Sequence, residues 1–373
     1  MTTMNLDHTA AFSRVDAAIA AVRAGQMVIL VDDEDRENEG DLTMSAELVT
    51  PDAINFMATH GRGLICVTLT EEQVNRLELP MMQPAGRAGP PLGTAFTVSV
   101  EARHGVTTGI SSADRALTVQ VSANPQSAAS DLVTPGHVFP LRARDGGVLV
   151  RTGQTEGSVD LARLAGLTPA GVICEIMNDD GTMARMPDLE IFARKHGLLI
   201  LSVADLIQYR LRMDRLVRRV HESTFTLAET GTEWRVVVYE EAMEKREIIA
   251  LVKGDVSPSE DVLVRMHDGG LFSDVFSDRR TLLAQSLRAI EAQGRGVVVY
   301  FPPRGSVAEA LGAKAGPVAK SKPVLQEYGL GAQILSNLGV RRLRLLTNTP
   351  LKLGGLAGFG LEIVETVAIA APV

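Results

Sequence analysis

The feature that most constrains the fold is a set of short, uninterrupted apolar runs in the first half of the chain. They lie at residues 27–31 (MVILV), 64–69 (LICVTL), 172–177 (VICEIM) and 198–203 (LLILSV). Runs of this length without polar alternation are typical of strands buried on both faces of a sheet. Because such strands need cover on each side, the runs predict a sheet with helices on both faces.

Helical patterns lie between these apolar runs. Apolar residues recur at helical spacing in 13–24, and Thr50 followed by proline is typical of a helix start. Further helices are expected at 158–165 and 187–196, whereas 94–121 is expected to contain strands only. The mixture predicts an α+β domain with three layers, helix, sheet and helix.

The chain has 373 residues, which is enough for two domains. Residues 205–220 form a basic amphipathic stretch that predicts one connecting helix. We place the domains at 1–212 and 213–373. Strand-like runs resume in the second part, at 234–239, 248–252 and 297–301.

Composition excludes several functional classes. The net charge of −8 argues against a nucleic-acid-binding surface, which needs a basic stripe. The two cysteines, Cys66 and Cys174, cannot make a disulfide framework and favour a reduced, cytoplasmic location. The first residues have no signal-peptide pattern, and no apolar run has the length of a membrane span. We therefore expect no nucleic-acid partner and no membrane partner.

An acidic run, DDEDRENEGD at 32–41, directly follows the first apolar run and contains seven carboxylates around Arg36. A charge run is ordinarily a solvated loop. Sheets of this kind, however, bind ligands at the ends of buried strands, and so many like charges repel unless a positive ion is bound. Hard oxygen ligands suit Mg²⁺ or Mn²⁺, and Arg36 suits a phosphate or an ion pair.

Two further segments carry polar groups suited to chemistry. His137 lies in a segment rich in glycine and proline (TPGHVFP), which we expect to be a loop, and a lone histidine is more often structural than catalytic. Residues 151–155 (RTGQT) combine a cation, two hydroxyls and a glycine, as in a phosphate-binding turn, although an ordinary surface turn can have the same composition.

Glu175 lies inside the apolar run VICEIM. Burial of a carboxylate costs free energy and raises its pKa, so Glu175 is either paired for structural reasons or a tuned acid–base group. Cys66 is interpreted as a small buried hydrophobic residue.

Taken together, these segments resemble the 3,4-dihydroxy-2-butanone 4-phosphate synthase family across residues 12–210. The resemblance depends on motifs that occur in one order, among them DDEDRENEGD, GVTTGISSADR, PGHVFPLRARDGGVL, RTGQTE and PAGVICEIMNDDGTMAR. It implies a metal-dependent lyase of riboflavin biosynthesis that converts D-ribulose 5-phosphate to L-3,4-dihydroxy-2-butanone 4-phosphate and formate. It also implies a homodimer of α+β subunits with two Mg²⁺ or Mn²⁺ ions per subunit.

The resemblance also assigns roles to individual residues. His137 and Glu175 would be the essential acid–base pair, and Glu37 would bind metal. Substrate would be bound by a larger set that surrounds them, namely Arg36, Glu37, Glu39, Asp41, Thr108, Arg151, Thr152, Gly153, Gln154, Thr155 and Glu175. One position departs from the family pattern, because Gln154 replaces the usual metal-binding histidine. An amide oxygen still suits Mg²⁺, so Gln154 is kept as a metal ligand.

Residues 247–366 resemble GTP cyclohydrolase II, a second α+β fold, through segments such as IIALVKGDV, EYGLGAQIL and LLTNTPLK. That family binds zinc through three cysteines, and this chain has no cysteine after Cys174. Its Gly-His-Glu-Gly-Arg-Gly segment is also replaced, at 302–313. His267, Asp268 and Asp274 are the remaining local metal-ligand candidates. We therefore expect a degenerate second domain without zinc.

The leading hypothesis is a single-activity synthase. Two alternatives stay open: a bifunctional synthase and GTP cyclohydrolase II, and a catalytically silent binding or scaffold protein. Formate release from ribulose 5-phosphate separates the enzyme from the scaffold.

Overall fold

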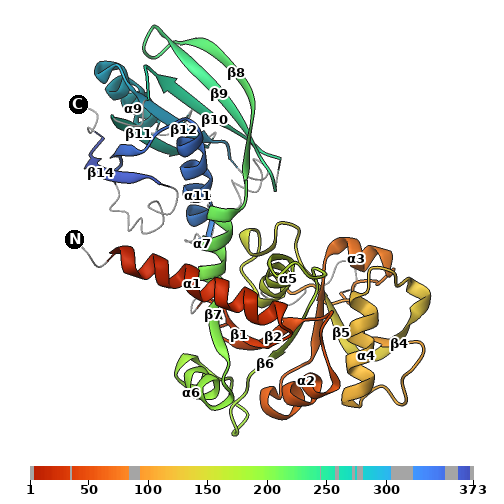
Figure 1. The fold of residues 1–373 in the computed structure, drawn as a ribbon. Helices are drawn as coiled ribbons and strands as arrows, with labels where there is room; N and C mark the ends of the chain where they lie inside the picture. The colour runs from red at the N-terminus through yellow and green to blue at the C-terminus, as the bar shows by residue number, and fades with distance from the viewer. Residues whose placement is uncertain are drawn as a thin grey trace. The chain divides into compact units, whose positions relative to one another are not determined.

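The computed structural model describes residues 4–33, 36–83, 93–243, 245–256, 260–270, 274, 280–303, 322–348 and 360–369 (Figure 1). The chain divides into two compact units between Arg210 and Leu211. The predicted boundary, after residue 212, lies close to this division. Each unit has its own sheet and its own helices.

The first unit is built on a seven-stranded sheet in the order β4-β5-β3-β6-β2-β1-β7. Neighbouring strands are antiparallel except for β1 with β7 and β3 with β5. The strands are β1 (Val28–Val31), β2 (Gly40–Ser45), β3 (Cys66–Leu69), β4 (Val100–Ala102), β5 (Leu132–Arg142), β6 (Gly171–Glu175) and β7 (Leu199–Ser202).

Helices cover both faces of this sheet, as predicted. Residues of α1, α5 and α7 pack on the face that carries Leu30, while residues of α2, α4 and α6 pack on the face that carries Ile29. Period-two alternation along β1 separates the two cores. The helices are α1 (Met4–Arg23), α2 (Pro51–Phe56), α3 (Glu71–Arg76), α4 (Ser112–Ala123), α5 (Gln154–Leu164), α6 (Met186–His196) and α7 (Val203–Met213).

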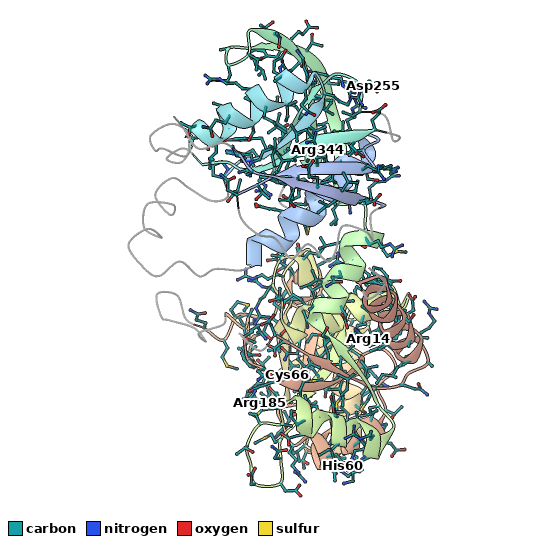
Figure 2. All side chains as sticks on the ribbon, turned by 90° about the vertical axis from the view of Figure 1, so that its left-hand side faces the viewer. Arg14, His60, Cys66, Arg185, Asp255 and Arg344 are labelled. Carbon is teal, nitrogen blue, oxygen red and sulfur yellow. The ribbon has the colours of Figure 1, made fainter. Side chains whose placement is uncertain are left out.

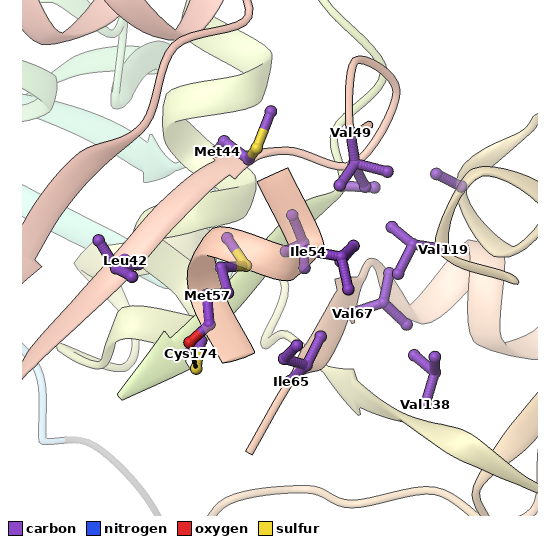
Figure 3. Close-up of a cluster of buried hydrophobic side chains, with 14 of the residues drawn as sticks. Leu42, Met44, Val49, Ile54, Met57, Ile65, Val67, Val119, Val138 and Cys174 are labelled. Carbon is purple, nitrogen blue, oxygen red and sulfur yellow. Dashed lines mark hydrogen bonds between the residues drawn. The ribbon is translucent and has the colours of Figure 1, made fainter. Parts of the chain in front are cut away.

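The larger core lies on the Ile29 face. Figure 3 shows part of this cluster, with Leu42 and Met44 of β2, Ile54 of α2, Val67 of β3 and Val119 of α4 among the labelled side chains. These side chains are almost completely buried. At about 25 cal/mol per Å² of apolar surface removed from water, each contributes roughly 1.5–3 kcal/mol. The sheet is therefore a firmly packed support for the residues at the ends of its strands.

Three expectations about helices were wrong. Residues 94–121 contain only β4 and the start of α4, whose N-cap Ser111 accepts a hydrogen bond from the backbone N–H of Asp114. The stretch 205–220 is not one helix, because α7 ends at Met213 and a strand begins at Val217. The first helix begins at Met4 rather than Ser13, since no helix breaker separates them.

The segment around His137 is a strand and not a loop. Residues 132–142 form β5, and the backbone of β4 lies very close to Gly136 of this strand. A Cβ atom at Gly136 would lie 2.0 Å from the carbonyl carbon of Val100. The glycine is therefore needed for the close approach of two strands and not for a turn.

The second unit has another seven-stranded sheet, in the order β14-β13-β11-β12-β10-β9-β8. Trp234 and Ile290 belong to its core, with α9 (Arg280–Gln293) packed on the strands. A further helix, α11, spans Lys322–Asn337. The strands are β8 (Val217–Leu227), β9 (Thr232–Glu241), β10 (Glu247–Lys253), β11 (Asp261–Asp268), β12 (Gly296–Phe301), β13 (Arg342–Leu346) and β14 (Glu362–Val367). The α+β class predicted for both parts is confirmed.

Membrane-spanning helices were also sought. Among the residues that the structure describes, no helix combines the length and the apolar character needed to cross a bilayer.

Candidate active site

The predicted acidic site lies at one end of the first sheet. Asp41 of β2 pairs with Glu175 of β6 in the strand register, and on its other side Asp41 pairs with Leu30 of β1. Residues directly opposite each other in a sheet point to the same face, with their Cβ atoms about 4.5–5.5 Å apart. The two carboxylates are therefore close neighbours.

Glu175 is the last residue of β6 and is only half-buried, whereas the sequence suggested a residue inside the strand. Its Oε2 accepts a 2.8 Å hydrogen bond from the backbone N–H of Leu64. A Cβ atom at Gly63 would lie 2.4 Å from the same oxygen. Only glycine at position 63 lets the backbone approach this carboxylate so closely.

His137 lies on the same face and at the same end of the sheet as Glu175. Cys66 of β3 pairs with Phe139 of β5 on one side and with Ile173 of β6 on the other. His137 and Glu175 each lie two residues further along, toward the same end. Since one strand separates β5 from β6 and strands lie about 4.8 Å apart, the two residues are about 10 Å apart across the sheet.

The imidazole of His137 is oriented by Glu101 of β4. Both carboxylate oxygens of Glu101 lie 3.2 Å from its Nδ1. A carboxylate acceptor favours the tautomer with the proton on Nδ1 and leaves Nε2 as the basic nitrogen. The side chain of His137 is 43% exposed, so Nε2 is accessible to a substrate.

The acidic run folds around a buried carboxylate. Asp32 accepts hydrogen bonds from the backbone N–H groups of Glu37 and Glu39, and its side chain has no solvent exposure. Asp41, at the end of the run, is also buried. A wholly solvated loop is thus excluded for these two residues. Glu34 and Asp35 lie outside the described residues.

Arg185, labelled in Figure 2, fixes the other side of the acidic run. Its Nη1 donates to the carbonyl oxygens of Glu37, at 2.6 Å, and of Asn38. The same atom lies 4.0 Å from a carboxylate oxygen of Glu39. Arg185 precedes α6, so the start of that helix is tied to the acidic run.

Arg36 connects the acidic run to α5. Its Nη1 lies 2.5 Å from Oδ2 of Asp32, 2.7 Å from Oε2 of Glu37 and 2.9 Å from Oε1 of Gln154. Gln154 in turn donates to the carbonyl oxygen of Glu39 at 3.3 Å. The two predicted metal ligands, Glu37 and Gln154, therefore lie side by side, with one guanidinium between them.

Residues 151–155 form the entry to a helix. Gly153 is the N-cap of α5 and no side chain caps the helix, so the positive end of the helix dipole lies at this segment. A Cβ atom at Gly153 would lie 2.6 Å from Nη1 of Arg151 and 3.1 Å from Nη2 of Arg36. Two cations thus converge on a helix N-terminus. Thr152 is partly exposed beside them, whereas Gln154 and Thr155 are buried.

The guanidinium group of Arg151 is held by two hydrogen bonds. Its Nη1 donates to Glu156 at 2.6 Å and its Nη2 donates to the hydroxyl of Thr94 at 2.9 Å. Glu156 is buried and also accepts from the backbone N–H of Arg144. Burial raises the pKa of Glu156, although Arg151 opposes the rise.

Thr108 is exposed on a loop that one carboxylate organises. Asp114 accepts hydrogen bonds from the backbone N–H groups of Thr107 and Gly109 and from the hydroxyl of Thr107. These bonds lower the pKa of Asp114 to about 2. The loop is therefore fixed, but no described contact joins Thr108 to the acidic run.

Negative charge dominates the electrostatics of the site. Burial, followed by the charges of Glu175 and Glu39, raises the pKa of Asp41 well above its usual range. Burial and the neighbouring Glu37 also raise the pKa of Glu39. Burial and the neighbouring negative charges therefore favour the protonated form of Asp41.

Oxygen donors suit a hard divalent cation. The Glu37 carboxylate and the Gln154 amide oxygen fit Mg²⁺, which is commonly held by one or two carboxylates and keeps several waters. Within the described ranges, no three His, Cys, Asp or Glu side chains form a metal-binding group. The carboxylate and amide oxygens of Glu37 and Gln154 therefore fit Mg²⁺ by their chemistry.

The second unit keeps part of a polar cluster. His267 of β11 is buried, and its Nε2 lies 2.9 Å from Asp274, which also accepts from the Tyr300 hydroxyl at 2.9 Å. Asp268 is exposed at the end of β11. Much of the segment replaced at 302–313 lies outside the described residues.

Several residues of the site were not identified from the sequence. Glu101 orients His137, Arg185 holds the acidic run and Glu156 holds Arg151. Only Glu156 carried a local signal, since it directly follows RTGQT. The other two contacts depend on tertiary structure.

The first unit is a sugar-phosphate lyase by family. The model of the 3,4-dihydroxy-2-butanone 4-phosphate synthase family matches residues 16–209, so the chain belongs to this family, which converts ribulose 5-phosphate in riboflavin biosynthesis. More particularly, the chain has the two-domain form, because the GTP cyclohydrolase II model matches residues 218–368.

Individual relatives agree with this assignment. The riboflavin biosynthesis protein RibBA of Aquifex aeolicus is 50% identical, over 96% of this chain and 92% of that protein. The crystal structure of RibBX, a two-domain synthase from A. baumannii, has a TM-score of 0.81 at 42% identity, covering 96% of this chain and 99% of that one. A synthase structure in complex with two magnesium ions has a TM-score of 0.52 at 42% identity, covering 54% of this chain and 97% of that one.

Proposed function

We propose that Asp41, His137 and Glu175 carry the proton transfers by which this chain converts ribulose 5-phosphate to dihydroxybutanone phosphate and formate. The supporting observation is their common position on one face and at one end of the sheet. Proton transfers by positioned groups of this kind each contribute about 10²–10⁴ in rate.

The reaction removes a proton next to a carbonyl, eliminates a hydroxyl, moves a carbon and releases formate. Glu175 keeps Oε1 available as a base, since only its Oε2 is bonded among the described residues. Asp41, with its raised pKa, supplies a proton to the departing hydroxyl. His137 exchanges a proton through Nε2 while Glu101 stabilises the charged imidazolium.

Phosphate binding is assigned to the start of α5. Arg36, Arg151 and the N–H groups after Gly153 present positive charge at one place. Binding energy from the phosphate can then be used to orient the reacting end of the sugar. Thr108 and Glu39 complete the walls of the pocket, and Thr152 and Thr155 flank the phosphate.

Glu37 and Gln154 would hold the divalent ion, Mg²⁺ or Mn²⁺. When bound, it supplies positive charge to the carbonyl and hydroxyl oxygens of the substrate. Two ions per subunit, a homodimer and a cytoplasmic location complete the proposal, and all three follow the family.

The test is formate release from ribulose 5-phosphate by the purified full chain with added Mg²⁺. We expect activity that EDTA abolishes and Mg²⁺ restores. Activity that persists after complete metal removal would contradict the metal-dependent mechanism, and absence of activity would favour a silent scaffold.

We further propose that the second unit does not open the imidazole ring of GTP. Zinc in the related enzymes is bound by thiolates, and the sequence has none after Cys174. His267 instead pairs with Asp274. Zinc analysis and formate release from GTP, both on the full chain, decide the question. Stoichiometric zinc together with GTP turnover would make the protein bifunctional.

A further inference from the structure

One nitrogen atom of Arg36 occupies a cradle of oxygen atoms. Nη1 contacts Asp32, Glu37 and Gln154 at 2.5, 2.7 and 2.9 Å. It carries two hydrogens and faces three acceptors, so the bonds are shared and the neutral amide is the weakest acceptor. The side chain of Arg36 is only 6% exposed and that of Asp32 is not exposed, whereas the Glu37 side chain is 30% exposed.

The cradle includes both side chains to which the proposed function assigns the metal. An oxygen that accepts from a guanidinium at 2.7 Å cannot at the same time coordinate Mg²⁺ at about 2.0–2.1 Å along the same lone pair. Like charges would also repel at that distance. A metal ion on Oε2 of Glu37 or Oε1 of Gln154 therefore competes with Arg36 for the lone pair that Nη1 occupies.

We propose that Arg36 is an internal cation that competes with the divalent metal ion for Glu37 and Gln154, so that metal binding and release of Arg36 occur together. This inference depends on the proposed metal site. Arg36 would keep Asp32 as a partner after release, since that carboxylate is fully buried.

Release of Arg36 has a direction. Its Nη2 already lies on the side of Gly153, where Arg151 converges on the start of α5. A guanidinium freed from Glu37 and Gln154 has its donors available for an anion at that helix N-terminus. Metal binding would thereby increase affinity for the phosphate group, and by linkage the phosphate would increase affinity for the metal by the same factor.

The net negative charge of the cluster favours a cation beside Glu37 and Gln154, either Arg36 or the divalent ion. The cluster holds five carboxylates and two guanidinium groups, namely Asp32, Glu37, Glu39, Asp41, Glu175, Arg36 and Arg185. Arg36 pairs with Asp32 and Glu37 and neutralises the part of the cluster nearest α5. A divalent ion that neutralises these carboxylates would free the guanidinium of Arg36 to bind an anion at the start of α5.

The first test measures Mg²⁺ binding to the metal-free full chain by calorimetry, without substrate. Arg36→Gln should tighten Mg²⁺ binding about tenfold, because it removes the competing cation; this corresponds to about 1.4 kcal/mol. Arg151→Gln is the matched control, since it removes a nearby cation whose described hydrogen bonds go to Glu156 and Thr94. Equal tightening in both variants, or none in Arg36→Gln, would overturn the inference.

The second test uses the unaltered protein, so it does not depend on the folding of a variant. Phenylglyoxal modification of arginine is followed by peptide mass analysis with and without Mg²⁺. Arg36 should react at least threefold faster with Mg²⁺, and Arg151 should not change. Protection of Arg36, or no change, would overturn the competition. Formate release measured on an unmodified portion of the same preparation reports separately whether the proposed function holds.

Discussion

Replacement of Glu175 by glutamine should separate catalysis from stability. Glutamine keeps a side-chain oxygen to accept from the Leu64 N–H, and it removes the charge beside Asp41. Two unit charges about 5 Å apart repel by about 3 kcal/mol at an effective dielectric constant of about 20. Because Asp41 already avoids part of this repulsion by holding a proton, we expect Glu175→Gln to stabilise the fold by about 1–2 kcal/mol.

The same substitution should lower turnover by about 10² or more, because it removes a proton-transfer group. Thermal unfolding should show a Tm raised by roughly 2–8 °C, at about 2–4 °C per kcal/mol for a unit of this size. Asp41→Asn is the control for charge at the paired position. A Glu175→Gln protein that unfolds at lower temperature and keeps its turnover would show that the carboxylate is structural, and the acid–base assignment would fail.

Three further predictions concern other parts of the first unit. His137→Asn should lower turnover by about 10² or more with the fold intact. Glu101→Gln should lower turnover less and shift the pH–rate profile, since Glu101 only orients the imidazole of His137; identical pH–rate profiles for Glu101→Gln and the parent would exclude that role. Gln154→Ala should weaken activation by Mg²⁺, and Gln154→His should remain active with a changed metal preference; a titration of Gln154→Ala that matches the parent would remove it from the metal site. Burial and the neighbouring His60 lower the pKa of His196 in the folded protein, so the contribution of His196 to stability is present above about pH 6.5 and is lost as the pH falls through the folded pKa. His196→Phe should therefore lose less Tm than the parent between pH 7 and pH 5. An equal loss of Tm in the two proteins would refute this.

Buried strands were predictable because their signal is local. The run MVILV contains β1, the runs at 64–69 and 198–203 contain β3 and β7, and the run at 172–177 overlaps β6. Layers followed from the same pattern, since strands that are apolar on both faces need helices on both sides. The helix in 94–121 was missed because its start depends on Ser111 and Asp114, which resemble ordinary loop residues until the cap is formed.

The chemistry of the site was predictable as residue types, but its arrangement was not. The charges of the acidic run and of Glu175 predicted a functional site. Only the register of β2 and β6 shows that Asp41 and Glu175 are neighbours. His137 was assigned to a loop because glycine and proline flank it. Partners such as Glu101 and Arg185 are distant in sequence from the residues they hold, and no periodicity reports such contacts.

The two glycines beside the proposed acid–base residues have a consequence for mutational scanning. Gly63 is pressed against the Glu175 carboxylate and Gly136 against the backbone of Val100, so even alanine would displace a neighbour at either position. In a growth screen that requires riboflavin synthesis, both positions should tolerate as few substitutions as His137. A ranking of residues by intolerance would then place two side-chain-free positions among the chemical groups. Only a purified Gly63→Ala protein, assayed for folding as well as turnover, would show which kind of loss had occurred.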